Sequence, residues 1–284
     1  MRQLVDILED REATSTIVEL TTVFEELASF HISLSKTQAQ LSRQFFADLW
    51  RIYTQIRVDK LFHFGRGRSA TAQVINKELM ILITSEGGLS GTIDNQLVQA
   101  ALQHYKPETN DIVVVGRHGA ILLTQRNIEY VRNFKMPASD RNINVGPLVA
   151  EVQRYASTVV FYETYESLMN QAVRSIKLSS AVAELGKNVK AGGDLISESN
   201  YIFEPSTFAV VDYLENSMMG IALSDFVLES KLAQYASRFR AMTAARDKAK
   251  DSLSGLNRQL NRAKRMIRDE RGKEVANNLL KVNL

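Results

Sequence analysis

Two long apolar repeats, one at each end of the chain, constrain its fold more than any other feature. In the second, apolar residues recur at alternating steps of four and three, interrupted by Arg246 alone. The members are Leu228, Leu232, Tyr235, Phe239, Met242, Ala249, Leu253, Leu256, Leu260, Ala263 and Ile267. A step averaging about 3.5 residues keeps one side of a helix against a partner in a left-handed coiled coil. The last helix therefore needs a partner helix.

The partner is predicted at the other end of the chain. Residues 1–64 contain no glycine and no proline, although the whole chain has 14 glycines and four prolines. The predicted seam consists of Ile17, Leu20, Phe24, Leu27, His31, Leu34, Gln38, Leu41, Phe45, Leu49, Ile52 and Ile56. Two such helices, pairing head to tail, would bury each other's apolar side. The sequence thus predicts an antiparallel coiled coil of the N- and C-terminal helices.

The residues between the two helices alternate between strand and helix patterns. Strands are predicted at 78–84, 111–116, 128–134, 158–163 and within 169–178, and helices at 94–105, 119–125 and 145–157. The continuous apolar runs of the first two strands suit a parallel sheet covered on both faces. Residues 186–200 are predicted to form a polar loop. We therefore predict an α/β fold in which a small Rossmann-like domain, residues 63–204, is inserted between coiled-coil helices at 1–62 and 205–284.

Composition narrows the class of protein. The chain has 284 residues, of which 45% are hydrophobic and 24% charged, as in ordinary folded proteins. It has no cysteine, which excludes disulfides and thiolate metal sites within it. No secretory signal and no run of about 18 apolar residues is recognised. We expect a soluble chain, or one that protein contacts hold to a larger assembly.

Charge is divided between the two ends. Residues 1–30 carry seven acidic residues against Arg2 and Arg11, whereas residues 231–284 carry fourteen lysines and arginines against five acids. Antiparallel pairing would set these opposite charges side by side. The alternative is that both runs are solvated helix faces. Because the basic helix has no aromatic stacking platform and no recognised motif, we predict no nucleic-acid partner.

Candidate chemistry is sparse. Residues 85–91 join a strand to a helix, where a phosphate loop would lie, but the Gly-Lys-Ser/Thr ending of such a loop is missing. Their glycines are interpreted as serving a tight turn. The histidines, His31, His63, His104 and His118, have no metal-ligand spacing and are interpreted as surface or interface residues. No serine, histidine and carboxylate grouping indicates a nucleophile. We predict no catalytic residue, no cofactor and no metal.

Local motifs add a family resemblance. The last helix carries Glu229-Ser230, Arg238, Ala241-Met242, Asp247 and Asn261-Arg262-Ala263-Lys264. Two further motifs are Ser85–Gly91 and Phe203-Glu204-Pro205, and residues 20–28 form a weaker one. With these residues the chain resembles the gamma subunit of the F-type rotary ATP synthases, as a divergent member. The last helix carries the most specific part of the resemblance.

The resemblance implies a function. Gamma subunits form the central stalk that turns inside a ring of alpha and beta subunits, which hold the nucleotides. Their rotation couples a proton- or sodium-driven membrane c-ring to ATP synthesis or hydrolysis, with the epsilon subunit as a further partner. The resemblance therefore implies a non-catalytic rotor subunit without a cofactor. It also implies a peripheral location on the cytoplasmic side of the cell membrane, with membrane contact only through protein partners.

The resemblance also implies site residues. Candidates for rotor–stator contacts are Arg238, Arg262, Lys264, Arg265, Arg268, Asp269 and Glu270. The loop signature of the family matches Ser85, Glu86, Gly88, Leu89 and Gly91.

The chain departs from the family pattern in three places. Glu19, Thr22 and His31 stand where lysines are usual, Gly87 replaces the basic residue of the loop, and residues 268–271 replace the usual tip pattern. Two alternatives therefore stay open. One is a gamma-like structural subunit of a specialised ATPase assembly that does not synthesise ATP, and the other is a stand-alone nucleotide-binding enzyme.

Overall fold

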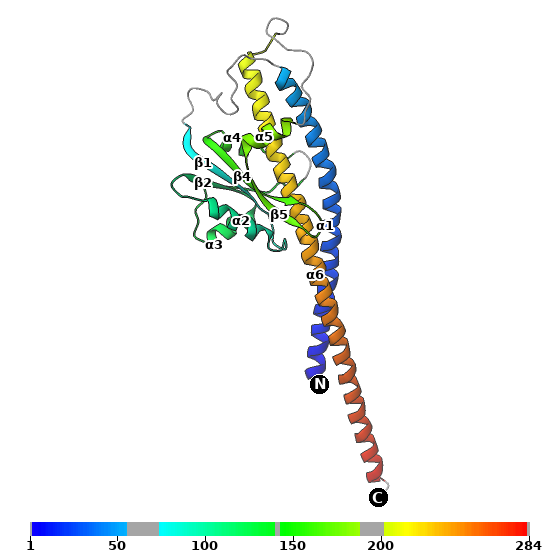
Figure 1. Cartoon of the computed structure of the whole chain (residues 1–284). Helices are drawn as coiled ribbons and strands as arrows, with labels where there is room; N and C mark the ends of the chain where they lie inside the picture. Colours follow the sequence, from blue (N-terminus) through cyan, green and yellow to red (C-terminus); the bar gives the residue numbers. More distant parts are fainter. Residues whose placement is uncertain (1, 56–73, 140–142, 188–201, 283–284) are drawn as a thin grey trace. The chain divides into compact units, whose positions relative to one another are not determined.

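The computed structural model describes residues 2–55, 74–139, 143–187 and 202–282 (Figure 1). The chain divides into two compact units. The helical unit comprises residues 1–27 and 239–284, and the α/β unit comprises residues 28–238. Helix α1 (Arg2–Gln55) and helix α6 (Thr207–Val282) each contribute residues to both units. Within the described segments, no helix combines the length and apolarity that crossing a membrane requires.

A five-stranded mixed sheet forms the centre of the α/β unit, in the order β3-β2-β1-β4-β5. The strands are β1 (Ile75–Ile83), β2 (Asn110–Val115), β3 (Arg132–Phe134), β4 (Tyr155–Tyr165) and β5 (Gln171–Lys177). All neighbouring strands run parallel except β4 and β5, which are antiparallel. In the register, Met80 on β1 lies opposite Ile112 on β2 and Val159 on β4. The predicted α/β fold, with long terminal helices and a mostly parallel sheet, is confirmed.

Helices cover both faces of this sheet, and alternate strand residues supply the two cores. Helices α2 (Ile93–His104) and α3 (Arg117–Gln125) lie on one face, over Met80, Leu82 and Phe161 (Figure 1). The opposite face is covered by α4 (Gly146–Val152), α5 (Leu178–Lys187), α1 and α6. Its core contains Leu79, Ile81, Val113, Phe46, Met218, Leu223 and Phe226. Helix α6 is therefore part of the hydrophobic core of the α/β unit.

Helices α1 and α6 run antiparallel within the α/β unit. The His31 ring stacks on the Tyr235 ring with centroids 4.6 Å apart. Further along, the Tyr53 hydroxyl donates a hydrogen bond of 3.2 Å to Glu215. Because residue numbers rise on α1 while they fall on α6, the predicted head-to-tail pairing is confirmed in this unit.

The helical unit shows the same antiparallel pairing. Arg11 Nε donates to the Asn257 side-chain oxygen at 2.8 Å. Glu25 pairs with Arg246 and also accepts a 3.0 Å hydrogen bond from the Thr243 hydroxyl. Within this unit α6 continues past the N-terminal end of α1 (Figure 1). Residues 268–276 are all exposed. This stretch of α6 has no helix packed against it among the described residues.

The contact face predicted for α1 is wrong for most of its members, although His31 stacks on Tyr235 and Leu49 packs against the core. The face predicted for α6 is confirmed. Every member of the α6 repeat is buried or half-buried. On α1, by contrast, Ile17 is 48% exposed and Leu20 is 52% exposed. The least exposed positions instead include Thr14, Val18, Thr21, Glu25, Ala28, Ile32 and Ser35. These also repeat at steps of four and three, but they are mostly small or polar, and small side chains let two helices approach closely. The larger apolar residues form a second face that points outward.

Smaller differences concern element ends. Tyr155 begins β4, so α4 ends at Val152, five residues before the predicted helix end. Helix α5 follows β5 without a break and was not predicted. The predicted boundary at residue 62 and most of the predicted polar loop at 186–200 lie outside the described residues.

Candidate functional site

The loop after β1, residues 85–91, lies against α6 inside the α/β unit. The Ser237 hydroxyl donates a 2.6 Å hydrogen bond to the Ser90 carbonyl oxygen, and both residues are buried. The Arg238 guanidinium makes a longer contact of 3.5 Å with the Gly88 carbonyl oxygen. Gly91 has φ +68°, and a Cβ there would lie 3.2 Å from Ser237 Oγ. The structure thus brings the loop signature together with part of the motif-bearing last helix.

A buried carboxylate holds this loop in place through hydrogen bonds. Asp94, in the first turn of α2, accepts hydrogen bonds from the Ser85 N–H at 2.8 Å, the Ser85 hydroxyl at 2.7 Å and the Ser90 hydroxyl at 2.8 Å. His118 Nδ1 lies 2.8 Å from the same carboxylate. The positive end of the helix dipole also favours an acidic residue here.

The negative charge of the Asp94 carboxylate and the positive charge of a protonated His118 stabilise each other. Burial raises the pKa of Asp94, but the hydrogen bonds from His118, Ser85 and Ser90 outweigh it and hold that pKa below its usual value. The hydrogen bond with Asp94 raises the pKa of His118, although partial burial opposes this. The pair therefore favours an ionised carboxylate next to a histidine that holds its proton more tightly than usual.

Glu163, on β4, is fully buried next to this cluster. Its backbone N–H donates a 3.0 Å hydrogen bond to Ser230 Oγ on α6. Within the described structure, neither carboxyl oxygen of Glu163 has a hydrogen-bond partner, and the buried amide nitrogen of Gln234 also has none. Burial, and then the nearby charge of Asp94, raises the pKa of Glu163 well above its usual value.

Two other residues of the loop, Glu86 and Leu89, differ in their surroundings: Glu86 binds the segment after β3, and Leu89 is exposed to solvent. Glu86 accepts a 2.9 Å hydrogen bond from the Met136 N–H, which ties the loop to the segment after β3. Lys231 on α6 reaches the same segment through a 2.9 Å bond to the Pro137 carbonyl oxygen. Leu89 is 57% exposed and has φ +70°, a conformation that is costly for a leucine. The loop therefore holds one apolar side chain out toward solvent.

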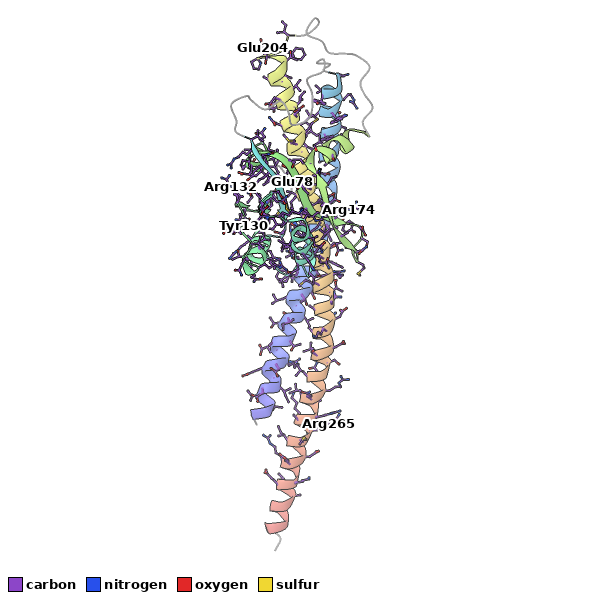
Figure 2. All side chains as sticks on the ribbon, turned by 60° about the vertical axis from the view of Figure 1, so that its left-hand side comes forward. Glu78, Tyr130, Arg132, Arg174, Glu204 and Arg265 are labelled. Atoms are coloured by element: carbon purple, nitrogen blue, oxygen red, sulfur yellow. The ribbon has the colours of Figure 1, made fainter. Side chains whose placement is uncertain are left out.

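The predicted rotor–stator residues fall into two groups. Arg238 belongs to the α/β unit and contacts the loop. The remaining six belong to the helical unit, and all are exposed: Arg262, Lys264, Arg265, Arg268, Asp269 and Glu270. The side chain of Arg265 projects outward from α6 (Figure 2). Their role in contacts with a partner stays a prediction.

The described residues show no arrangement for metal chemistry. No group of three histidine, aspartate or glutamate side chains among them could hold a metal ion. His31 stacks on Tyr235, and His104 packs 5.6 Å from the Phe161 ring. His63 lies outside the described residues. His118, interpreted from the sequence as a surface or interface residue, instead contacts the buried Asp94.

Sequence reasoning missed the cluster of Asp94, His118, Glu163 and Gln234. These residues come from α2, α3, β4 and α6, and no local spacing relates them. One signal was available, because Glu163 ends the apolar run of a predicted strand. A charged residue there needs a partner or a proton.

Comparison with known proteins gives a consistent match. The family model described as ATP synthase matches residues 4–267. The ATP synthase gamma chain of Cytophaga hutchinsonii is 25% identical over 210 residues, covering 69% of this chain and 70% of that one. That of Prosthecochloris aestuarii is 23% identical over 279 residues, covering 93% of each chain.

A solved structure agrees on the fold. A chain of the Euglena gracilis mitochondrial ATP synthase OSCP/F1/c-ring structure superposes with a TM-score of 0.63 at 13% sequence identity. The match covers 98% of this chain and 94% of that one.

Proposed function

This chain belongs to the gamma-chain family of ATP synthases, and from that membership we propose how it works. It is the central rotor subunit, which couples ion-driven rotation of a membrane c-ring to ATP synthesis or hydrolysis in a ring of alpha and beta subunits. It performs no bond chemistry itself. It associates with the epsilon subunit and is held at the cytoplasmic side of the cell membrane through its protein partners.

One observation carries the proposal: the same unbroken helix, α6, packs in the core of the α/β unit and pairs with α1 in the helical unit. It is a single helix from Thr207 to Val282. In the α/β unit its Met218, Leu223 and Phe226 are core residues packed on the sheet. In the helical unit it pairs with α1 through Arg246 and Asn257. A turning force applied to this helix must therefore act on the α/β unit, because the helix cannot rotate without breaking that core.

The loop and sheet contacts of α6 support the same function. Ser237 and Ser230 attach α6 to the loop and to β4 through hydrogen bonds to buried backbone groups. Such bonds are directional, unlike apolar packing, and they resist sliding of the helix along the sheet. They complement the non-directional core contacts.

The outer face of α1 supports a place inside a larger assembly. In the helical unit Leu20, Val23 and Leu27 are exposed, and in the α/β unit Phe30 and Phe45 are exposed. Large apolar side chains exposed on one face of a helix whose other face is packed on a partner helix are typical of a surface that other subunits cover. We propose that alpha and beta subunits cover this face.

We further propose that the exposed residues near the end of α6 contact the beta subunits. Arg262, Lys264, Arg265 and Arg268 are basic and solvent-accessible. Positive side chains at the rim of an interface set orientation and register more than affinity. They suit acidic loops on a partner.

A pull-down from native membranes tests the proposal. The tagged full-length chain is purified under mild detergent and its partners are identified by mass spectrometry. Alpha, beta, epsilon and c subunits together support the rotor function. Alpha- and beta-like subunits without a c-ring would instead indicate a specialised ATPase assembly that does not synthesise ATP. Recovery of none of these subunits would overturn the proposal.

A further inference from the structure

Two carboxyl groups are buried together where the sheet, the loop and α6 meet. Asp94 and Glu163 each have no exposed surface. Both belong to the junction with α6: Asp94 accepts from the Ser90 hydroxyl, the Ser90 carbonyl oxygen accepts from Ser237 on α6, and the Glu163 N–H donates to Ser230 on α6. The charge of Asp94 also raises the pKa of Glu163. Two ionised carboxylates in one buried site repel strongly, and such a pair normally keeps one proton.

The hydrogen bonds decide which carboxyl is ionised. Asp94 receives donors from Ser85, Ser90 and His118, all of which stabilise a negative charge. Glu163 has the Gln234 amide beside it but no donor like those of Asp94, and within the described structure neither of its oxygens has a hydrogen-bond partner. An ionised Glu163 would thus be an uncompensated buried charge, which is far costlier than a neutral acid.

Charged groups on the surrounding elements are engaged elsewhere. On α6, Lys231 donates to the Pro137 carbonyl oxygen and Arg238 contacts the Gly88 carbonyl oxygen. On the loop, Glu86 accepts from the Met136 N–H, and on α3 His118 contacts Asp94. None of these groups neutralises an ionised Glu163, so the carboxyl group is kept neutral by a proton.

We propose that Glu163 is protonated at neutral pH and donates this proton in a hydrogen bond to Asp94, so that one shared proton joins β4 to α2 and the loop beside α6. The second oxygen of the acid then accepts from the Gln234 amide, which gives that amide a partner as well. Loss of the proton places two negative charges in the site. The neighbouring contacts of α6 with Ser90 and with the Glu163 N–H then weaken, so the attachment of the loop and sheet to α6 depends on pH.

The sign of the pH effect follows from linkage. In the unfolded chain Glu163 ionises near the ordinary pKa of a glutamate, whereas in the folded chain it keeps its proton to higher pH. Stability from this group is complete below the unfolded pKa and declines as pH rises toward the folded pKa. In that window the unfolding equilibrium constant rises by up to about tenfold per pH unit.

Glu163→Gln tests the proposal, because an amide reproduces the neutral acid. It donates to Asp94, accepts from Gln234 and cannot ionise. Urea unfolding of the full-length chain should show the variant gaining on the wild type as pH rises, by up to about tenfold in equilibrium constant per unit. If the ratio of the two unfolding equilibrium constants, variant to wild type, were the same at every pH, the proposal would be contradicted.

Infrared spectroscopy reads the proton directly. At neutral pH the wild type should show a carbonyl band of a buried protonated carboxylic acid, which Glu163→Gln removes. Glu151→Gln is the matched control, because Glu151 is also buried but its carboxylate is paired with Arg132 and Arg154. That variant should keep the band. Asp94→Asn removes the neighbouring charge and should move the titration of the band to lower pH. A wild-type spectrum without the band would overturn the proposal.

Discussion

The two serine hydroxyls that attach α6 to the loop and to β4 offer the sharpest test of the junction. Ser237 Oγ donates to the Ser90 carbonyl oxygen at 2.6 Å, and Ser230 Oγ accepts from the Glu163 N–H at 3.0 Å. Replacing either serine by alanine removes one oxygen and little volume. What remains is a buried backbone group without its partner.

The size of the effect follows from burial. Ser230 is 0% exposed and Ser237 is 1% exposed, so water cannot easily replace the lost bond. An unpaired buried donor or acceptor costs about 1–3 kcal/mol. The two serines are seven residues apart, about 10 Å along a helix, so their effects should add within about 0.5 kcal/mol. The free energy of unfolding should fall by about 2–6 kcal/mol in the double variant.

Urea unfolding of the full-length chain, at one fixed pH, measures these changes. Ser252→Ala is the matched control. Its hydroxyl also bonds a backbone carbonyl on α6, that of Lys248, but it is exposed. The control should change the free energy of unfolding by less than about 0.5 kcal/mol. If Ser237→Ala and Ser230→Ala changed it no more than the control, the hydrogen-bonded attachment of α6 would be refuted.

Three further changes probe the loop, the outer face of α1 and the helix pair. Leu89→Gly should leave the free energy of unfolding unchanged or raise it by up to about 1 kcal/mol, because relief at φ +70° offsets the flexibility of glycine; a clear loss in urea unfolding would mean that this side chain packs within the chain. Phe45, which is 59% exposed, should tolerate replacement by glutamine within about 0.5 kcal/mol in a thermal melt. The same variant should recover less alpha and beta subunit in a pull-down, and full recovery would argue against a subunit interface there. Glu25→Gln breaks the pair with Arg246 and should cost about 1.5–3 kcal/mol in low salt, whereas Glu12→Gln, at an exposed position, should cost almost nothing. If Glu25→Gln and Glu12→Gln lowered the free energy of unfolding equally, the loss would come from the change in net charge and not from one ion pair.

The sequence predicts the architecture well because the periodic signals are long. The repeat on α6 has one apolar side, so its contact face follows directly from the spacing. Helix α1 has two candidate faces, and the larger side chains, such as Leu20 and Phe45, lie on the outer one. Hydrophobicity alone favours the bulkier face. The inner face, with Thr21 and Ala28, is recognised only when the partner helix is present.

The buried cluster was not predictable for a different reason. Asp94, His118, Glu163 and Gln234 are separated by tens of residues and meet only when the sheet order is known. Strand β1 lies between β2 and β4, so its loop reaches both the start of α3 and the end of β4. No local pattern encodes that meeting point.

The loop signature and the motif of the last helix matched the family as separate segments, but in the structure part of the helix motif contacts the loop and part contacts the sheet. Ser230 belongs to that helix motif, and its hydroxyl accepts the N–H of Glu163. Arg238 belongs to it as well and reaches the loop at Gly88. Gly91 permits the approach, because a side chain there would crowd Ser237. These three motif residues are thus explained by the segments they contact more than by their own neighbours in sequence. If the helix transmits torque, these residues resist the sliding that apolar core packing alone would allow, and the proton on Glu163 would then set how firmly the helix is held.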